Sequence, residues 1–372
     1  MNKQLAFGKL PSTWRRFEEL GAAKNLKAED FYRPADNHSV QHRNGRTGEI
    51  LVSHPQPDIP EKQLHARTHR SKLQLALLKE VDETRVRLSS KLVHVTQEPS
   101  GRLLLEFQEG FKDEVYLLIG ADGVRSAVRT FAFPDHRISY IGRTSYRTVI
   151  TAEEIATIDG VPDAVTFWHG PKSWLYTCPL GDSKFEITTM TPEPASEKEK
   201  VSWGQDATIE ENSKHFEIKQ YALFAGPRLK SVIAYGSIAL VGDASHPLSG
   251  AFGSGAGFAL EDVFVLSRAV NWAHEQNLTL QDGLRLFDQV RGPYYRDLYG
   301  VLDKFGEADQ YLKNVDLGFD DAVNVQVDKK WSKKYNWIQE YNGKKCQGSE
   351  GARCAIGKKR KFHWTALENL GF

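Results

Sequence analysis

Apolar residues recur with the period of an amphipathic helix in several parts of the chain. Residues 11–28 begin at Pro11-Ser12-Thr13, a typical helix start, and place Trp14, Phe17 and Leu20 on one face. The pattern therefore predicts a helix, rather than a strand, as the first element. The same spacing predicts further helices over Arg70–Val81, about 257–275 and about 280–312.

The predicted helix at 257–275 is long enough to cover a core along one stripe of its surface. Residues spaced three and four apart share a helix face. The stripe expected to face inward is made of Leu260, Val263, Phe264, Ser267 and Val270.

Short runs rich in β-branched and aromatic residues, separated by Gly and Pro, predict strands between these helices. Runs of this kind stand at Ile50–Val52, Leu92–Val95, Leu103–Phe107, Val115–Ile119 and Ile238–Val241. From Tyr140 to Leu223 such runs follow one another without a helical pattern between them. That region is expected to form a mostly antiparallel sheet.

Composition narrows the class of protein. The chain has 372 residues and 40% apolar content, enough for about two globular domains. Its formal net charge of +1 gives no general attraction to nucleic acid or to a membrane surface, and no apolar run is long enough for a membrane span. The three cysteines are too scattered for a disulfide framework. We therefore expect a cytoplasmic protein with a small-molecule partner.

One stretch carries the clearest chemistry. The apolar run Ile238–Val241 leads into Gly242-Asp243, and a glycine-rich loop with Gly253 and Gly255 then opens the helix at 257–275. Free backbone N–H groups at a helix start favour an anionic ligand, and glycines let a ligand approach the backbone closely. An ionised Asp243 is an acceptor suited to the hydroxyls of a polyol chain. This pattern favours a cofactor that carries negative charge.

A second motif, Gly120-Ala121-Asp122-Gly123 followed by Arg125 and Arg129, ends the predicted strand before it. Together the two motifs resemble the class A flavoprotein monooxygenases, the FAD-dependent aromatic hydroxylases, and within them the fungal salicylate-hydroxylase-like branch. The resemblance extends over about residues 10–312. A weaker match is His69-Arg70-Ser71, where the family has an arginine near the flavin. Taken alone, each motif is also compatible with an ordinary turn.

The resemblance implies FAD as cofactor and NADPH or NADH as co-substrate. It implies cofactor contacts from Arg70, Asp122, Gly123, Arg129, Gly242, Asp243, Gly253, Gly255 and Ala256. It also implies an α/β fold in which a Rossmann-like FAD-binding domain carries an inserted substrate-binding sheet. The expected domains are 1–139 and 236–312 for FAD, 140–235 for substrate, and 313–372 as a basic, partly disordered tail.

The family begins with a strand, a G-x-G-x-x-G turn and a helix, which this sequence does not contain. Its opening, Leu10–Trp14, resembles the stretch that follows that unit. We therefore expect a truncated FAD domain with weakened affinity for FAD. A protein that no longer turns over, and acts at most as a binding module, is the alternative hypothesis.

Within the predicted sheet, Arg147 is similar to a substrate-positioning arginine of related fungal enzymes, and Tyr176 presents a phenol two residues before Cys178. The resemblance assigns both to catalysis on an aromatic or phenolic substrate, while packing within the sheet is an equally good interpretation of Tyr176. We interpret His246 as structural. The cysteine and histidine spacings match no common metal site.

Overall fold

The computed structural model describes residues 6–9, 11–35, 38–55, 60–193, 203–206, 217–248, 253 and 255–332. The chain divides into two compact units. The first, which we call the sheet unit, comprises Met1–Glu80, Tyr140–Phe224 and Gly300–Glu340. The second, which we call the α/β unit, comprises Val81–Ser139, Ala225–Tyr299 and Tyr341–Phe372. Compactness does not report which residues bind a ligand, so the expected functional domains stay a prediction.

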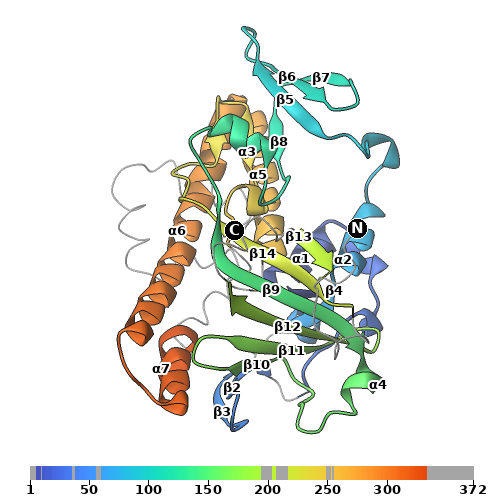
Figure 1. The fold of residues 1–372 in the computed structure, drawn as a ribbon. Helices are drawn as coiled ribbons and strands as arrows, with labels where there is room; N and C mark the ends of the chain where they lie inside the picture. The colour runs from blue at the N-terminus through green and yellow to red at the C-terminus, as the bar shows by residue number, and fades with distance from the viewer. Residues whose placement is uncertain are drawn as a thin grey trace. The chain divides into compact units, whose positions relative to one another are not determined.

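The sheet unit is built on eight strands, whose path can be followed in Figure 1. Their spatial order is β13 (Trp203–Asp206), β14 (Lys219–Ala225), β9 (Ser139–Thr151), β12 (Lys184–Pro192), β11 (Trp174–Leu180), β10 (Thr166–His169), β2 (His38–Asn44) and β3 (Ile50–Pro55). The pair β2–β10 is parallel, and β10–β11, β11–β12, β12–β9, β2–β3 and β13–β14 are antiparallel. The expected mostly antiparallel sheet is confirmed, and it also takes in two strands from before residue 60.

Smaller elements complete the sheet unit. They are β1 (Ala6–Lys9), α1 (Pro11–Glu19), η1 (Ala22–Asn25), η2 (Ala28–Asp30), η3 (Glu61–Gln63), β4 (Ala66–His69), α2 (Arg70–Leu78), α4 (Ala152–Ile155) and α7 (Phe319–Trp331). The prediction that a helix comes first is wrong, because β1 precedes α1 and pairs with β4. The expected helix over 11–28 also ends early, since Gly21 adopts a left-handed conformation with φ of 73°.

The α/β unit contains two three-stranded sheets and the helices that cover them. Its elements are η4 (Glu83–Arg85), β5 (Leu92–Gln97), β6 (Leu103–Phe107), β7 (Lys112–Val115), β8 (Leu118–Gly120), α3 (Ala127–Ala132), β15 (Ile233–Ala234), β16 (Ile238–Leu240), η7 (Gly242–Ala244), α5 (Gly255–Glu275) and the first part of α6 (Leu280–Lys313). One sheet has the order β15-β16-β8 and the other β5-β6-β7. The single strand expected over Val115–Ile119 is therefore two strands in two different sheets.

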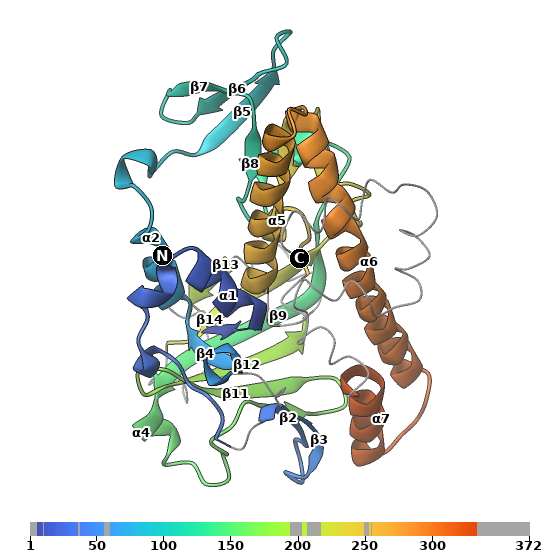
Figure 2. The same cartoon turned by 180° about the vertical axis from the view of Figure 1, so that it is seen from behind.

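Helix α5 and the first part of α6 lie side by side in both views (Figures 1 and 2) and share the core of the α/β unit. Leu266 and Ala269 of α5 and Leu284 and Phe287 of α6 belong to that core. The stripe expected on α5 is wrong by about one residue, because Val263 is 49% exposed. The buried positions of α5 are Gly257, Phe258, Glu261, Asp262, Val265, Leu266, Ala269, Trp272 and Ala273.

The helix expected over 280–312 is present as α6, which has Pro293 inside it. The expected basic tail, 313–372, falls mostly outside the described residues. Its early part forms the ordered helix α7, where Ala322, Val323 and Val327 are buried.

Candidate functional site

The two glycine-containing motifs end neighbouring parallel strands. Strand β8 pairs with β16, and Gly120 lies opposite Leu240. The Gly120–Val241 backbone hydrogen bond of 3.0 Å extends this pairing toward the following turns. Because parallel strands end at the same edge of a sheet, Asp122 and Asp243 follow at the same edge. The structure thus brings together two motifs that are about 120 residues apart in sequence.

Arg129 joins these two turns directly. Its buried guanidinium donates to the carbonyl oxygens of Asp243, at 3.2 Å, and Ala244, at 2.9 Å, and also to that of Val124. Burial lowers the pKa of Arg129, while the nearby carboxylates of Asp122 and Asp243 act to raise it. The arginine is therefore a bridge between the motifs, and its contact with a cofactor stays a prediction.

The exposed carboxylate of Asp122 holds the start of helix α3. Its Oδ2 accepts from the backbone N–H groups of Ala127, at 2.7 Å, and Val128, at 3.2 Å. The Ser126 hydroxyl accepts from the N–H of Arg129 at 2.8 Å. These bonds satisfy backbone donors that a helix start leaves unpaired. Gly123, with φ of 78°, has open space where a Cβ would stand.

Asp243 lies in the short helical turn η7, beside the start of α5. Its Oδ1 is 3.8 Å from the point where a Cβ on Gly255 would stand. Gly242 before it has a φ of 58°, and a Cβ there would meet Ala259 at 3.0 Å. Only glycine fits such a left-handed position without strain. Asp243, Gly253, Gly255 and Ala256 are all exposed, whereas 249–252 and 254 lie outside the described residues.

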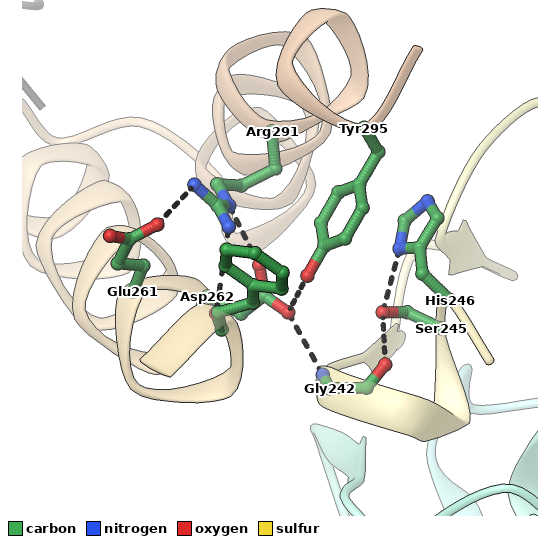
Figure 3. Close-up of polar contacts among 8 residues, drawn as sticks. Gly242, Ser245, His246, Glu261, Asp262, Arg291 and Tyr295 are labelled. Atoms are coloured by element: carbon green, nitrogen blue, oxygen red, sulfur yellow. Dashed lines mark hydrogen bonds and ion pairs between the residues drawn. The ribbon is translucent and has the colours of Figure 1, made fainter. Parts of the chain in front are cut away.

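A buried ionic network behind this turn is shown in Figure 3. Arg291 of α6, 1% exposed, donates to Asp262 Oδ1 at 2.7 Å and to Glu261 Oε2 at 3.3 Å. Asp262 Oδ2 accepts from the Tyr295 hydroxyl at 2.7 Å and from the Gly242 N–H at 2.8 Å. A buried charge is tolerated when it is paired and hydrogen-bonded. The network therefore ties α6 and α5 to the turn that presents Asp243.

His246 completes this support, as Figure 3 also shows. Its ring stacks on Tyr295 with centroids 3.4 Å apart, and its Nδ1 lies 2.9 Å from the Ser245 hydroxyl. Ser245 in turn donates to the Gly242 carbonyl at 2.7 Å. Burial lowers the pKa of His246 to about 3, so the ring is neutral near pH 7. This geometry agrees with a structural role.

The two residues expected in catalysis lie on one face of the sheet in the sheet unit. Tyr176 is opposite Thr188, which is opposite Arg147, across strands β11, β12 and β9. Arg147 Nε lies 2.7 Å from the buried Glu186 carboxylate and 3.0 Å from Thr188 Oγ1. Tyr176 is buried, and burial raises its pKa well above the ordinary value. Arg70, also in the sheet unit, is the exposed first residue of α2.

Sequence reasoning missed Arg291, Tyr295 and Arg67. The first two are four residues apart on α6 and so share a helix face, but nothing in the sequence says that this face is buried. Arg67, in β4, has its guanidinium 5.5 Å from the ring centroid of Tyr176. No sequence signal distinguishes it from other arginines.

No family profile matches the chain, but individual proteins do. The 3-amino-4-hydroxybenzoate 2-monooxygenase PtmB3 of Streptomyces platensis is 26% identical over 249 residues, covering 62% of this chain and 60% of that protein. The FAD-dependent monooxygenase sor5 of Hypocrea jecorina is 24% identical over 271 residues, or 58% of each chain. The chain is thus similar to FAD-dependent monooxygenases. It spans about 60% of the length of these curated relatives.

The fold of the chain is also found in a solved structure. A solved structure described as a salicylate hydroxylase substrate complex superposes with a TM-score of 0.72 at 18% identity, covering 90% of this chain and 88% of the other. Within the described residues, no helix is both long and apolar enough to cross a membrane. The same part of the chain contains no group of three or more His, Cys, Asp or Glu suited to hold a metal ion.

Proposed function

We propose that the protein is an FAD-dependent monooxygenase that hydroxylates a small aromatic or phenolic compound with O₂ and NADPH or NADH. The single observation that carries this proposal is the meeting of the two strand-end turns, joined by Arg129 and set beside the start of α5. A stretch of exposed backbone at a helix start, next to a carboxylate, suits a ligand with both anionic groups and hydroxyls. FAD has both.

In this proposal the residues of the α/β unit hold the cofactor. The Asp243 carboxylate would accept a hydrogen bond from a ribityl hydroxyl, and the exposed backbone at Gly255 and Ala256 would be available to the flavin. The left-handed Gly242 keeps the backbone close to the ligand. The Gly123 turn, which has open space around it, makes a second contact. Bound FAD would supply the reduction by the nicotinamide and the activation of O₂.

The sheet unit supplies the substrate side of the proposed reaction. Arg147 and Tyr176 orient the aromatic ring, and the buried Tyr176 hydroxyl stays protonated because its pKa is raised. Functionally, we assign residues 1–139 and 236–312 to the cofactor and 140–235 to the substrate. The assignment of Arg70 to the cofactor stays a prediction. A cytosolic location and a small aromatic partner, with no nucleic acid, accompany the proposal.

The proposal is tested with the purified full chain, FAD and NADPH. A panel of benzoates and phenols is added in turn, and hydroxylated product is identified by mass spectrometry with ¹⁸O₂ as oxygen source. The expected result is NADPH consumption that depends on one class of aromatic compound and product that contains ¹⁸O. Flavin binding without labelled product from any member of the panel would count against hydroxylation, and no flavin binding would count against the whole proposal.

A further inference from the structure

Arg67 is held firmly by its backbone, yet its side chain has no hydrogen-bond partner among the described residues. In strand β4 it lies opposite Gly8 of β1, and its N–H and C=O groups exchange bonds with Tyr32 at 2.9 and 2.8 Å. The Nε of Arg67 is fully buried and makes no hydrogen bond to any residue that the structure describes. The backbone of Arg67 is thus held in place, and its guanidinium has donors that no described residue accepts.

The charges around Arg67 do not balance. Two guanidinium groups, those of Arg67 in β4 and Arg147 in β9, are influenced by one carboxylate, that of Glu186, which lies 2.7 Å from Arg147 Nε. Burial acts to lower the pKa of Arg67, but Tyr176, Cys178 and Glu186 raise it overall, so the group is cationic at every working pH. The cluster therefore has a net positive charge. A desolvated charge is costly unless it is paired.

Tyr176, which packs against the guanidinium of Arg67, also lacks a well-formed hydrogen bond. Its hydroxyl is fully buried and makes none among the described residues. Its neighbour Cys178 is a weak partner, and the thiol donates instead to the Pro179 carbonyl at 3.0 Å. A neutral phenol donor and a cationic fork are thus adjacent, and neither has an acceptor oxygen. An anion would satisfy both.

Further aromatic rings lie next to Tyr176 on the same face of the sheet. Phe167 has its ring centroid 4.9 Å from that of Tyr176 and 5.4 Å from that of Trp174. Phe167 and Trp174 are only partly buried, so their rings retain some accessible surface. Aromatic faces and edges beside a cation favour a ligand that is itself a flat ring with a negative group.

We propose that Arg67 is the specificity-determining residue for substrate charge, and that it selects aromatic anions by pairing with a carboxylate or phenolate oxygen beside Tyr176. That the selected anions are substrates rests on the proposed function. That Arg67 binds an aromatic anion concerns the sheet unit alone. Arg147 is less suited to this role because Glu186 already neutralises it.

The test is a ligand-observed NMR titration of the full chain in the presence of saturating FAD. One arm compares benzoate with its neutral counterpart benzamide, and the other compares 4-nitrophenolate with 4-nitroanisole. In the wild type, at least one anion is expected to bind about 10- to 100-fold more tightly than its neutral partner, as for a hydrogen bond between charged groups. Arg67→Gln is expected to abolish that preference.

The matched control is Arg43→Gln. Arg43 also stands over an aromatic ring, that of Trp168 at 5.6 Å, but Trp168 is adjacent in sequence to Phe167 and so faces the other side of the sheet. Its removal should leave the preference for the anion unchanged. If Arg67→Gln does not fold by circular dichroism, Arg67→Lys decides the question. Lysine keeps the charge but not the planar fork, so the preference should weaken without disappearing.

Equal binding of anion and neutral partner by the wild type overturns the inference. So does a preference that survives unchanged in Arg67→Gln or Arg67→Lys. The flavin absorbance of the same samples separates this from the proposed function. A chain that binds no FAD but prefers benzoate through Arg67 refutes the monooxygenase proposal alone, and one that hydroxylates substrates regardless of Arg67 refutes the inference alone.

Discussion

Removing the Arg291 guanidinium should destabilise the protein strongly. Arg291→Met keeps much of the side-chain volume, but it leaves the carboxylates of Asp262 and Glu261, which are 1% and 7% exposed, without their positive partner. Breaking a buried ion pair by removing one member costs about 3–5 kcal/mol, because the other member stays buried and uncompensated. We expect a loss of this size in the free energy of unfolding.

The assay is urea unfolding followed by tryptophan fluorescence, since Trp272 of α5 packs in the same core. The matched control is Arg285→Met, on the same helix. Arg285 also pairs with an aspartate, Asp282 at 2.9 Å, but its side chain is 59% exposed. Exposed pairs contribute about 0–1 kcal/mol, so this control should unfold almost like the wild type.

A second variant checks the cause of the loss. Adding Asp262→Asn to Arg291→Met removes one buried charge and keeps an oxygen that accepts from the Gly242 N–H. The double variant should regain part of the lost stability, because fewer buried charges are then unpaired. If Arg291→Met costs no more than Arg285→Met, the buried network does not support the turn in the way described.

Three further perturbations follow from the structure. Burial lowers the pKa of His169 to about 4 from an ordinary 6.5, so between these pH values the unfolded chain binds a proton that the folded chain does not, and stability falls as the pH drops. Urea midpoints measured across that range should show the loss of stability, and the loss should be smaller in His169→Gln. Gly242→Ala forces a side chain into a left-handed position 3.0 Å from Ala259, so we expect a cost of about 1–3 kcal/mol in the unfolding assay, and an unaltered midpoint would contradict it. Asp122→Ala removes the acceptor for two N–H groups at the start of α3, and thermal unfolding should report a loss of about 1 kcal/mol, whereas Asp122→Asn should lose less.

The strand, turn and helix around Asp243 were predictable because each is a local pattern. Ile238–Leu240 is an uninterrupted apolar run, Gly242 marks a turn, and the helix that follows, which is 21 residues long, has apolar residues at helical spacing. The meeting of the two motifs came from family resemblance, since no pattern in a single sequence states which strands pair.

The buried face of α5 was not predictable from hydrophobic spacing. Glu261 and Asp262 are charged yet buried, and their partner Arg291 is about 30 residues later in the chain. A prediction that places every charged residue on the exposed face therefore assigns the wrong face of α5 to the core. The same reasoning failed for Val115–Ile119, because one apolar run supplies strands to two separate sheets.

The residues of the sheet unit that we propose to bind substrate were predictable only in part. Arg147 and Tyr176 were both expected in the sheet, but only the register across β11, β12 and β9 shows that they lie on one face. Glu186 pairs with Arg147, whereas Arg67 Nε makes no hydrogen bond to any described residue, and both facts depend on contacts between residues distant in sequence.

The most direct test of the account is an FAD titration of the full chain and its Asp243→Ala variant, followed by quenching of flavin fluorescence. Asp135→Ala, which changes an exposed aspartate elsewhere in the α/β unit, is the matched control. We expect the wild type and Asp135→Ala to bind FAD alike and Asp243→Ala to bind it about 10-fold or more weakly, as for loss of a charge-assisted hydrogen bond. Equal affinity in all three proteins would contradict the claim that the two strand-end turns hold a flavin.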